Sequence, residues 1–342
     1  MHIIFYKYML SVIIFFLIIP ASAAHAAGGV PDGNGPLVHD MQLFEDTSGA
    51  LNIREASSPA YRNKYVRHDR IPNYGFTRSA VWVRLTAAGD PSVDTERILE
   101  VLYPALNLIE VYIPDGRGGF TVKTGGSRAP FAGREIAHRN SLFRIPVKAG
   151  DGTEVFVRIR SESALNFSIR LHDIIEFQRR DYVEQLFLGM FYGVLLVMLL
   201  YNLFLYFSVR DTSYLLYVCY TASNILFSLS IHGLAYQFLW PGAGEWAVRS
   251  HPFFTASTLL CAVLFSSHFL QMREYSVLFH RFFQVMAVII ACAIAGALFC
   301  PYRYCIRANV ILTYVMLPVI IAASVYAIRR GYRPAKYFLA GW

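Results

Sequence analysis

The chain lacks cysteine in its first half. All five of its cysteines lie after residue 185: Cys219, Cys261, Cys292, Cys300 and Cys305. The preceding segment therefore holds no disulfide, and its hydrophobic core must stabilise the fold alone. The sequence also lacks a Cys-x-x-Cys motif and any metal-ligand spacing. We therefore expect neither a metal ion nor another cofactor.

Charge is absent from five long apolar runs in the second half. Each is about as long as the ~20 residues that a helix needs to cross a bilayer. Ion-coupled transporters and pumps keep ionisable groups at membrane depth, so their absence argues against transport. A sixth run begins at Tyr337 and has only six residues, so we expect five full spans and the start of a sixth. The five runs are 186–209, 213–230, 252–270, 282–300 and 308–328.

Composition and charge distribution agree with a membrane protein. The chain is 55% hydrophobic, with a mean hydropathy of +0.40 and a net charge of +8. Residues 27–185 contain 20 basic and 20 acidic side chains, whereas residues 186–342 contain ten basic and three acidic ones. The positive excess therefore lies mainly between the apolar runs, where membrane topology explains it. We exclude nucleic acid as a partner.

The N-terminus resembles an export signal. Lys7 precedes an apolar stretch, 9–19, and small residues then offer cleavage sites, which predicts a signal peptide over 1–26. A retained N-terminal anchor is the alternative. With residues 27–172 exported, loops on the inner side of the membrane hold seven basic residues and outer loops hold three. The positive-inside rule thus favours a multi-pass protein of the bacterial inner membrane with a periplasmic N-terminal domain.

Short alternating segments fill most of residues 27–172. Val81–Leu85 alternates with period two, as a strand with one buried face does, and six similar segments follow it. Many short strands separated by turns predict a β-sandwich. Residues 173–185 are polar, and we expect a helix there that leads into the first span of the helix bundle, 186–342. This linker either carries motion or only tethers the domain.

The exported domain offers side chains of the kinds that bind sugars. Aromatic rings stack on pyranose faces, and polar side chains bind the hydroxyl groups. The candidates are Trp82, Arg84, Tyr103 and the loop residues His138, Arg139 and Asn140. Each has an ordinary alternative: core packing for Trp82, a solvated strand face for Arg84 and a plain loop for residues 138–140. No paired carboxylates, nucleophile elbow or phosphate loop stand out, so we predict no catalytic residue and no enzyme.

Several longer stretches resemble one bacterial family, the seven-transmembrane receptors with diverse intracellular signalling modules. The exported part is similar to their type 2 extracellular domain in VWVRL (81–85), LEVLYPALNLIEVYIPDGRGGF (99–120), APFAGREIAHRNSLFRIPV (129–147) and VFVRIRSES (155–163). The second half is similar to their seven-helix region in FLGMFYGVLLVMLLYNLFLYFSVRDTSYLLYVCY (187–220), HGLAYQFLWPG (232–242) and RRGYRPAKYFLAGW (329–342). The chain departs from that pattern by stopping where the sixth helix starts.

The resemblance implies a jelly-roll-like sandwich that binds a small periplasmic ligand, of which carbohydrate is one class. It also implies a relay through the helices to a cytoplasmic output, which is absent from this chain. The partners to consider are this ligand, the lipid bilayer, a second copy of the chain and a separate cytoplasmic signalling protein. The alternatives are a membrane-anchored binding or scaffolding protein that transmits nothing, and an exported hydrolase acting on cell-wall sugar.

Overall fold

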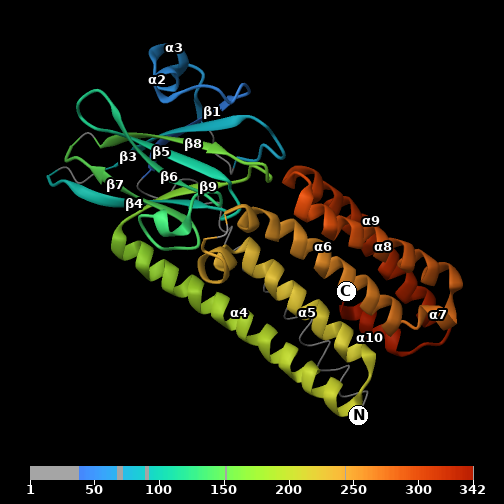
Figure 1. The fold of residues 1–342 in the computed structure, drawn as a ribbon. Helices are drawn as coiled ribbons and strands as arrows, with labels where there is room; N and C mark the ends of the chain where they lie inside the picture. The colour runs from blue at the N-terminus through green and yellow to red at the C-terminus, as the bar shows by residue number, and fades with distance from the viewer. Residues whose placement is uncertain (1–37, 68–71, 89–91, 151, 243, 342) are drawn as a thin grey trace. The chain divides into compact units, whose positions relative to one another are not determined.

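The computed structural model describes residues 38–341 except 68–71, 89–91, 151 and 243 (Figure 1). The predicted signal peptide, 1–26, lies outside the described residues. The chain forms two compact units. The sandwich unit runs from the first strand to Glu184 and includes Leu229–Val248. The helical unit consists of Gln185–Ser228 and the residues from Arg249 onward.

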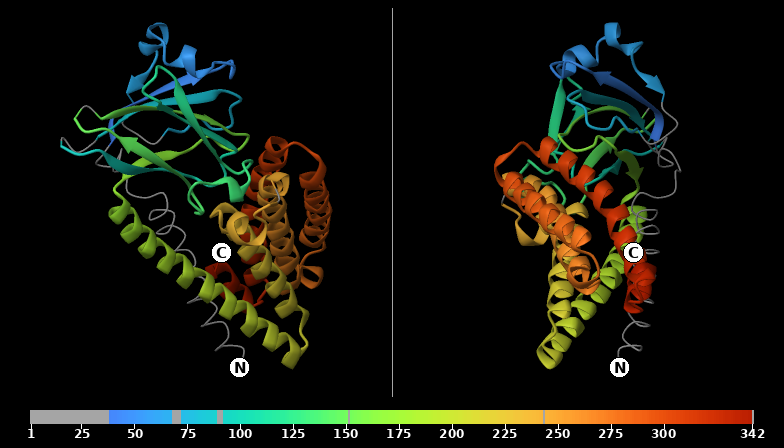
Figure 2. Two further views of the ribbon diagram at one scale, coloured as in Figure 1. Left: turned by 60° about the vertical axis from the view of Figure 1, so that its left-hand side comes forward. Right: turned by 90° about the vertical axis from the view of Figure 1, so that its right-hand side faces the viewer.

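The sandwich unit is built on two antiparallel sheets (Figures 1 and 2). The larger has six strands in the order β2 (Val66–Arg67), β1 (Val38–Asp46), β3 (Ala80–Ala87), β8 (Thr153–Arg160), β5 (Leu108–Pro114) and β6 (Phe120–Gly125). The smaller has three in the order β7 (Ser141–Val147), β4 (Thr95–Leu102) and β9 (Ser168–His172). The N-terminal domain is therefore a β-sandwich, as predicted.

Every second residue of the strands points into the core between the two sheets. Val81, Val83 and Leu85 of β3 are fully buried in it, together with Leu99 and Val101 of β4. Successive strand residues point to opposite faces, so the residues between these lie on the outer faces of the two sheets. Both outer faces are covered in part, which makes the sandwich more than two layers thick.

The outer face of the larger sheet carries a second, aromatic core. Two short helices, α2 (Ile53–Ala56) and α3 (Pro59–Arg62), stand in the connection between β1 and β2. Trp82 and Phe156 are buried there with Tyr65 and Tyr112. The ring centroids of Trp82 and Tyr112 lie 5.6 Å apart. Aromatic packing of this kind stabilises beyond the buried area alone.

The outer face of the smaller sheet is buried and partly polar. The residues of β4 and β9 that point to this outer face include Glu100, Arg170 and His172. All three are buried. Charged side chains are seldom buried without partners. Glu100 finds such partners in Asn140 and His172, and the ring of Phe177 from helix α4 (Ile174–Val209) lies beside His172.

The helical unit contains five helices that are long and apolar enough to cross a membrane, counted over the described residues. They are α4, α5 (Thr212–Ile231), α6 (Gly244–Phe269), α8 (Val277–Phe299) and α9 (Tyr302–Arg329). All five predicted spans are thus confirmed as helices. Two shorter helices, α7 (Met272–Tyr275) and α10 (Pro334–Gly341), complete the unit. Its interior is mainly apolar, with Phe283, Met316 and Phe338 buried, and it also holds a few buried polar side chains such as Asn309.

The predicted strands are all present, but the sequence interpretation missed the first part of the sandwich. β1, β2, α2 and α3 were not expected. β1 has a register irregularity between His39 and Gln42, which interrupts the strict alternation that identifies a strand from sequence. β2 has only two residues, too few for any period to show.

Candidate functional site: the contact between the sandwich and the first turns of α4

The site begins where β9 ends and α4 starts. Asp173 precedes the helix, and its side chain accepts a hydrogen bond from the amide of Ile175 at 3.4 Å. Its carboxylate also pairs with Arg97 of β4 at 2.5 Å. A carboxylate at this position satisfies a free helix amide and lies favourably in the helix dipole. Asp173 therefore fixes the start of α4 to the smaller sheet.

A buried histidine contacts the helix two turns later. His138, in the loop before β7, lies 2.9 Å from Asp181 of α4 through its Nε2 atom. Its Nδ1 atom accepts a hydrogen bond from the amide of Asn140 at 3.1 Å. An atom that accepts carries no proton, so the neutral ring holds its proton on Nε2 and donates it to Asp181. The loop geometry thus selects one tautomer of His138.

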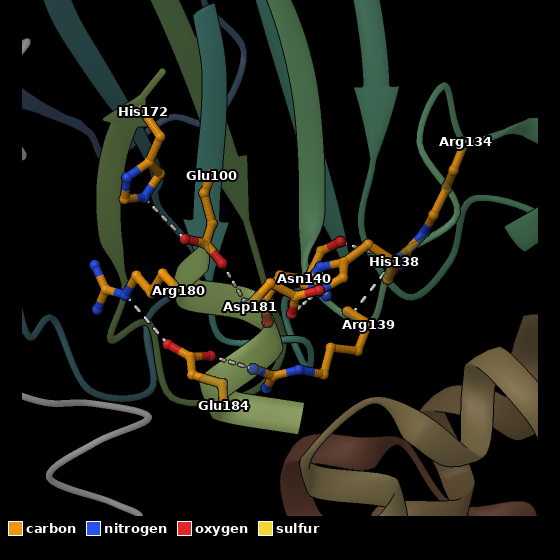
Figure 3. Close-up of polar contacts among 9 residues, drawn as sticks. All are labelled: Glu100, Arg134, His138, Arg139, Asn140, His172, Arg180, Asp181 and Glu184. Atoms are coloured by element: carbon orange, nitrogen blue, oxygen red, sulfur yellow. Dashed lines mark hydrogen bonds and ion pairs between the residues drawn. The ribbon is translucent and has the colours of Figure 1, made fainter. Parts of the chain in front are cut away.

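The next residue in the loop forms a second contact with α4. The guanidinium of Arg139 pairs with the carboxylate of Glu184, and both side chains are largely buried. Arg180, one turn earlier on the helix, donates from Nε to the other oxygen of Glu184 at 3.3 Å. Hydrogen bonds between charged groups are stronger than neutral ones, and removing one partner of a buried pair is costly. The carboxylate of Glu184 thus pairs with two guanidinium groups, that of Arg139 from the loop and that of Arg180 from its own helix (Figure 3).

Glu100 of β4 is a hydrogen-bond partner of this loop. One carboxylate oxygen accepts from the side-chain Nδ2 of Asn140 at 2.7 Å, and the other lies 3.2 Å from Nε2 of His172 (Figure 3). Burial raises the pKa of the Glu100 carboxyl, but the hydrogen bonds from His172 and Asn140 outweigh it and lower the pKa below its ordinary value of 4.5. Glu100 is therefore ionised at neutral pH, and it orders both of its partners.

Phe177 of α4 lies between the two imidazoles. Its ring centroid is 5.5 Å from that of His138 and 6.0 Å from that of His172. The helix thus presents Phe177, Asp181 and Glu184, spaced by four and three residues, on one face toward the sandwich. This face combines an aromatic ring with two partly buried acids.

Arg134 shapes the loop from its other side. Its Nη1 atom donates to the carbonyl oxygens of His138 at 2.5 Å and Asn140 at 3.2 Å. Its guanidinium also lies 5.0 Å from the ring centroids of Phe131 and Tyr236. Burial lowers the pKa of Arg134, against the effect of the nearby Tyr236, yet an arginine stays charged at neutral pH. One side chain thus connects the loop to the segment between α5 and α6.

That segment, Leu229–Val248, belongs to the sandwich unit. Tyr236, in the π-helical turn η2 (Ala235–Leu239), donates from its hydroxyl to the carbonyl of Ala129. Gly233 has φ +77°, and a side chain there would come within 2.7 Å of Pro104 and 2.9 Å of the Arg139 carbonyl. Glycine is therefore required for this close approach. The same loop that contacts α4 also contacts the connection between two further spans.

The predicted ligand residues fall into two groups that the fold keeps apart, and Tyr103 belongs to neither. Trp82 and Arg84 lie on the outer face of the larger sheet, where Trp82 is fully buried and Arg84 pairs with Glu154 at 2.5 Å. Ligand contact by Trp82 would require the aromatic core above it to open. Tyr103 follows β4 with a left-handed φ of +97° and packs against the main core.

The second group comes together at the α4 contact. His138, Arg139 and Asn140 are all buried there, and Pro104 and the Arg139 carbonyl share the space beside Gly233. Because these three side chains already bind protein groups, the structure gives them a role in the contact between loop and helix. Ligand binding by any of the six stays a prediction. Among the described residues, no three His, Cys, Asp or Glu side chains gather where a metal ion could bind.

Sequence analysis did not identify Glu100, His172, Phe177, Asp181 and Glu184 as parts of this site. A signal for three of them exists: residues 177, 181 and 184 share one face of the helix expected over 173–185. A single acid within the apolar run Ile98–Leu102 was the signal for Glu100. Neither pattern names a partner, because partners come from strands distant in the sequence.

A sandwich that holds the start of an apolar, membrane-length helix defines a folded domain joined to a multi-pass membrane region. Comparison with protein families agrees with this class. Residues 38–173 match the profile described as 7TMR-DISM extracellular 2, and residues 184–342 match the one described as 7TM diverse intracellular signalling. The chain belongs to this family of transmembrane sensory receptors. A search of curated proteins finds no match.

Proposed function

We propose that this chain is the sensory and transmembrane portion of a bacterial signal-transduction receptor. The sandwich binds a small ligand in the periplasm, with carbohydrate as the expected class. Binding changes the helix bundle, which relays the change to a cytoplasmic output. A ligand shifts such an equilibrium only by the difference in its affinity for the two states.

The observation that supports this proposal most is the continuity of α4. The helix runs 36 residues from Ile174 to Val209. Its first turns are held by buried polar contacts, and its later turns form an apolar span. A helix is a stiff rod that rises ~1.5 Å per residue, so a displacement at one end moves the other end as well. A flexible linker would not transmit it. The polar linker of the sequence interpretation is thus a stiff connection.

The orientation rests on charge. With the sandwich in the periplasm, loops on the cytoplasmic side carry seven basic residues against three outside, as the positive-inside rule requires. The jelly-roll description of the sandwich and the inner-membrane location belong to the same proposal. Reaction of a membrane-impermeant thiol reagent with an introduced Thr121→Cys in intact spheroplasts tests this orientation, with the unsubstituted chain as the control.

A thermal-shift screen tests ligand binding. Full-length protein in detergent is heated with each of a panel of neutral monosaccharides, with glycerol at equal osmolality as the control. A ligand at 100 times its Kd stabilises the bound state by about 2.7 kcal/mol. We expect at least one sugar to raise Tm in a saturable manner. No shift with any member of the panel would contradict carbohydrate as the ligand class.

A further inference from the structure

A groove lies where the two sheets of the sandwich meet at one edge. β6 is the last strand of the larger sheet, and β7 is the last strand of the smaller one. The groove between them has a volume of about 280 Å³ and is lined by Lys123, Thr124, Gly133, Arg134, Glu135 and Ser141, among others. Ligand sites are concave and combine apolar walls with a few polar groups, and small ligands need only small volumes.

We propose that this groove is the ligand site of the sandwich and that it takes a neutral polyhydroxylated molecule the size of one monosaccharide. The proposal rests on the sensory function proposed above. It adds the place where the ligand binds and the residue through which binding reaches α4.

The polar groups of the groove suit hydroxyl groups better than a charge. Lys123 donates from Nζ to both oxygens of Glu135, at 2.9 and 2.8 Å, and to the Arg144 carbonyl at 2.8 Å. The Lys123 and Glu135 side chains are 26% and 34% exposed, so both remain accessible. Together the two side chains are neutral. The bonds above use all three N–H donors of Lys123, whereas the Glu135 carboxylate can still accept. A hydroxyl group of a polyol can therefore donate to Glu135 without adding charge.

The remaining wall supplies a small apolar surface and further hydroxyl groups. Val122 and Leu142 line the groove beside Thr124 and Ser141. Sugar rings carry C–H faces as well as hydroxyl groups, so a mixed lining of this kind matches both. The small volume leaves space for one ring rather than for an oligosaccharide.

Arg134 connects this groove to the α4 contact. Gly133, Arg134 and Glu135 lie in the loop that continues to His138, Arg139 and Asn140. While Arg134 lines the groove, its guanidinium holds the carbonyl oxygens of His138 and Asn140. Its buried Nε–H has no hydrogen-bond partner among the described residues. A ligand beside Arg134 can therefore alter the loop whose side chains contact Asp181 and Glu184.

Two substitutions add bulk to the lining of the groove. Gly133 has an ordinary backbone conformation and open space around it, so Gly133→Trp adds an indole there at little cost to folding. Thr124 is exposed on β6 and belongs to the same lining, so Thr124→Trp adds bulk on the β6 side. The matched control is Thr121→Trp, because Thr121 is also exposed on β6 but is not part of the lining.

Binding is measured by isothermal titration of full-length protein in detergent with the neutral monosaccharide panel. We expect a sugar that binds the wild type and the Thr121→Trp control with equal Kd, and that binds Gly133→Trp and Thr124→Trp at least tenfold more weakly. The same sugar should alter amide hydrogen exchange over 138–140 and 177–184 in the wild type and the control.

Two outcomes contradict the inference in different ways. Unchanged affinity in Gly133→Trp and Thr124→Trp would place the ligand elsewhere in the sandwich and leave the sensory function intact. The absence of binding by every sugar, in the wild type as well, would contradict both this site and carbohydrate sensing. Binding in the groove without any change in exchange over 177–184 would remove the proposed link through Arg134.

Discussion

Glu100 shows how one buried carboxylate can order a site. It accepts from Asn140 and faces His172, and each of these also belongs to the loop or strand that contacts α4. If the carboxylate is removed, two buried polar groups lose their partner. Leaving such groups unsatisfied costs about 1–3 kcal/mol each.

We therefore expect Glu100→Ala to lower the free energy of unfolding of the full chain by about 2–4 kcal/mol. Glu96→Ala is the matched control, since Glu96 is on the same strand but forms an exposed pair with Arg144. Exposed pairs of this kind contribute about 0–1 kcal/mol. Urea unfolding followed by the sandwich's tryptophan fluorescence gives both values. Equal decreases in the free energy of unfolding of the two variants would show that the hydrogen bonds of Glu100 stabilise the fold no more than an exposed ion pair does.

His232 predicts a pH dependence of stability. Burial, and then the nearby Arg139, lowers the pKa of its imidazole from 6.5 to about 4. The unfolded chain therefore binds a proton between pH 6.5 and about 4 that the folded chain does not, and stability falls as pH falls through this window. Glu100 acts lower down: its pKa is depressed, so its stabilising effect is present above pH 4.5 and is lost only as pH falls further.

We expect His232→Gln to flatten the change in Tm between pH 6.5 and about 4 while leaving the loss below pH 4.5 in place. Thermal unfolding of the wild type and of His232→Gln at a series of pH values gives the Tm of each. If the slope in the upper window is identical in wild type and variant, the buried neutral state of His232 is incorrect.

At the scale of elements, α4 is held by side chains and not by backbone pairing. His138 and Asp181 come from a loop and a helix and meet only through their side chains. A double-mutant cycle with His138→Ala and Asp181→Ala should give a coupling energy of about 0.5–3 kcal/mol. The exposed pair Arg128–Glu162, with side chains 46% and 42% exposed, is the control and should couple by less.

Amide hydrogen exchange over 174–184 should rise in both single variants of the His138–Asp181 pair, because the first turns of α4 lose a contact. Little change in that segment, together with a coupling energy no larger than that of Arg128–Glu162, would mean that the helix start is held by its other contacts, Asp173–Arg97 and Arg139–Glu184.

The sequence was sufficient to predict elements whose pattern is local. β3 alternates over Val81–Leu85, and the spans are long uncharged runs, so both were predicted close to their observed places. β1 and β2 were missed because an irregular register and a length of two residues leave no period to detect. The helical character of 173–185 was predicted, but its contacts were not, since they depend on residues 97, 138 and 139.

At the scale of the whole molecule, the two halves share one helix. The sandwich unit ends at Glu184 and the helical unit begins at Gln185, in the middle of α4. The sandwich unit also includes Leu229–Val248, so the connection between α5 and α6 contacts the sandwich, as in the hydrogen bond from Tyr236 to Ala129. This second contact was not foreseen, because a segment between two apolar runs gives no sequence sign of what it touches. Residue types alone also placed Trp82 and His138 in one candidate set, although the fold puts Trp82 on the larger sheet and His138 in the loop before β7.

The central claim is that ligand binding in the sandwich reaches the membrane helices through the unbroken α4. Hydrogen-exchange mass spectrometry of the full chain in nanodiscs, with and without a binding monosaccharide, tests it most directly. The comparison is between the wild type and a variant with two glycines inserted after Glu184, which breaks the helix but leaves the sandwich contacts in place. We predict that sugar changes exchange in the helix-connecting segments 210–212 and 270–276 of the wild type, and that the insertion confines the change to the sandwich while binding persists. A ligand effect that stops at Glu184 in the wild type would contradict the account and favour a membrane-anchored binding protein that transmits nothing.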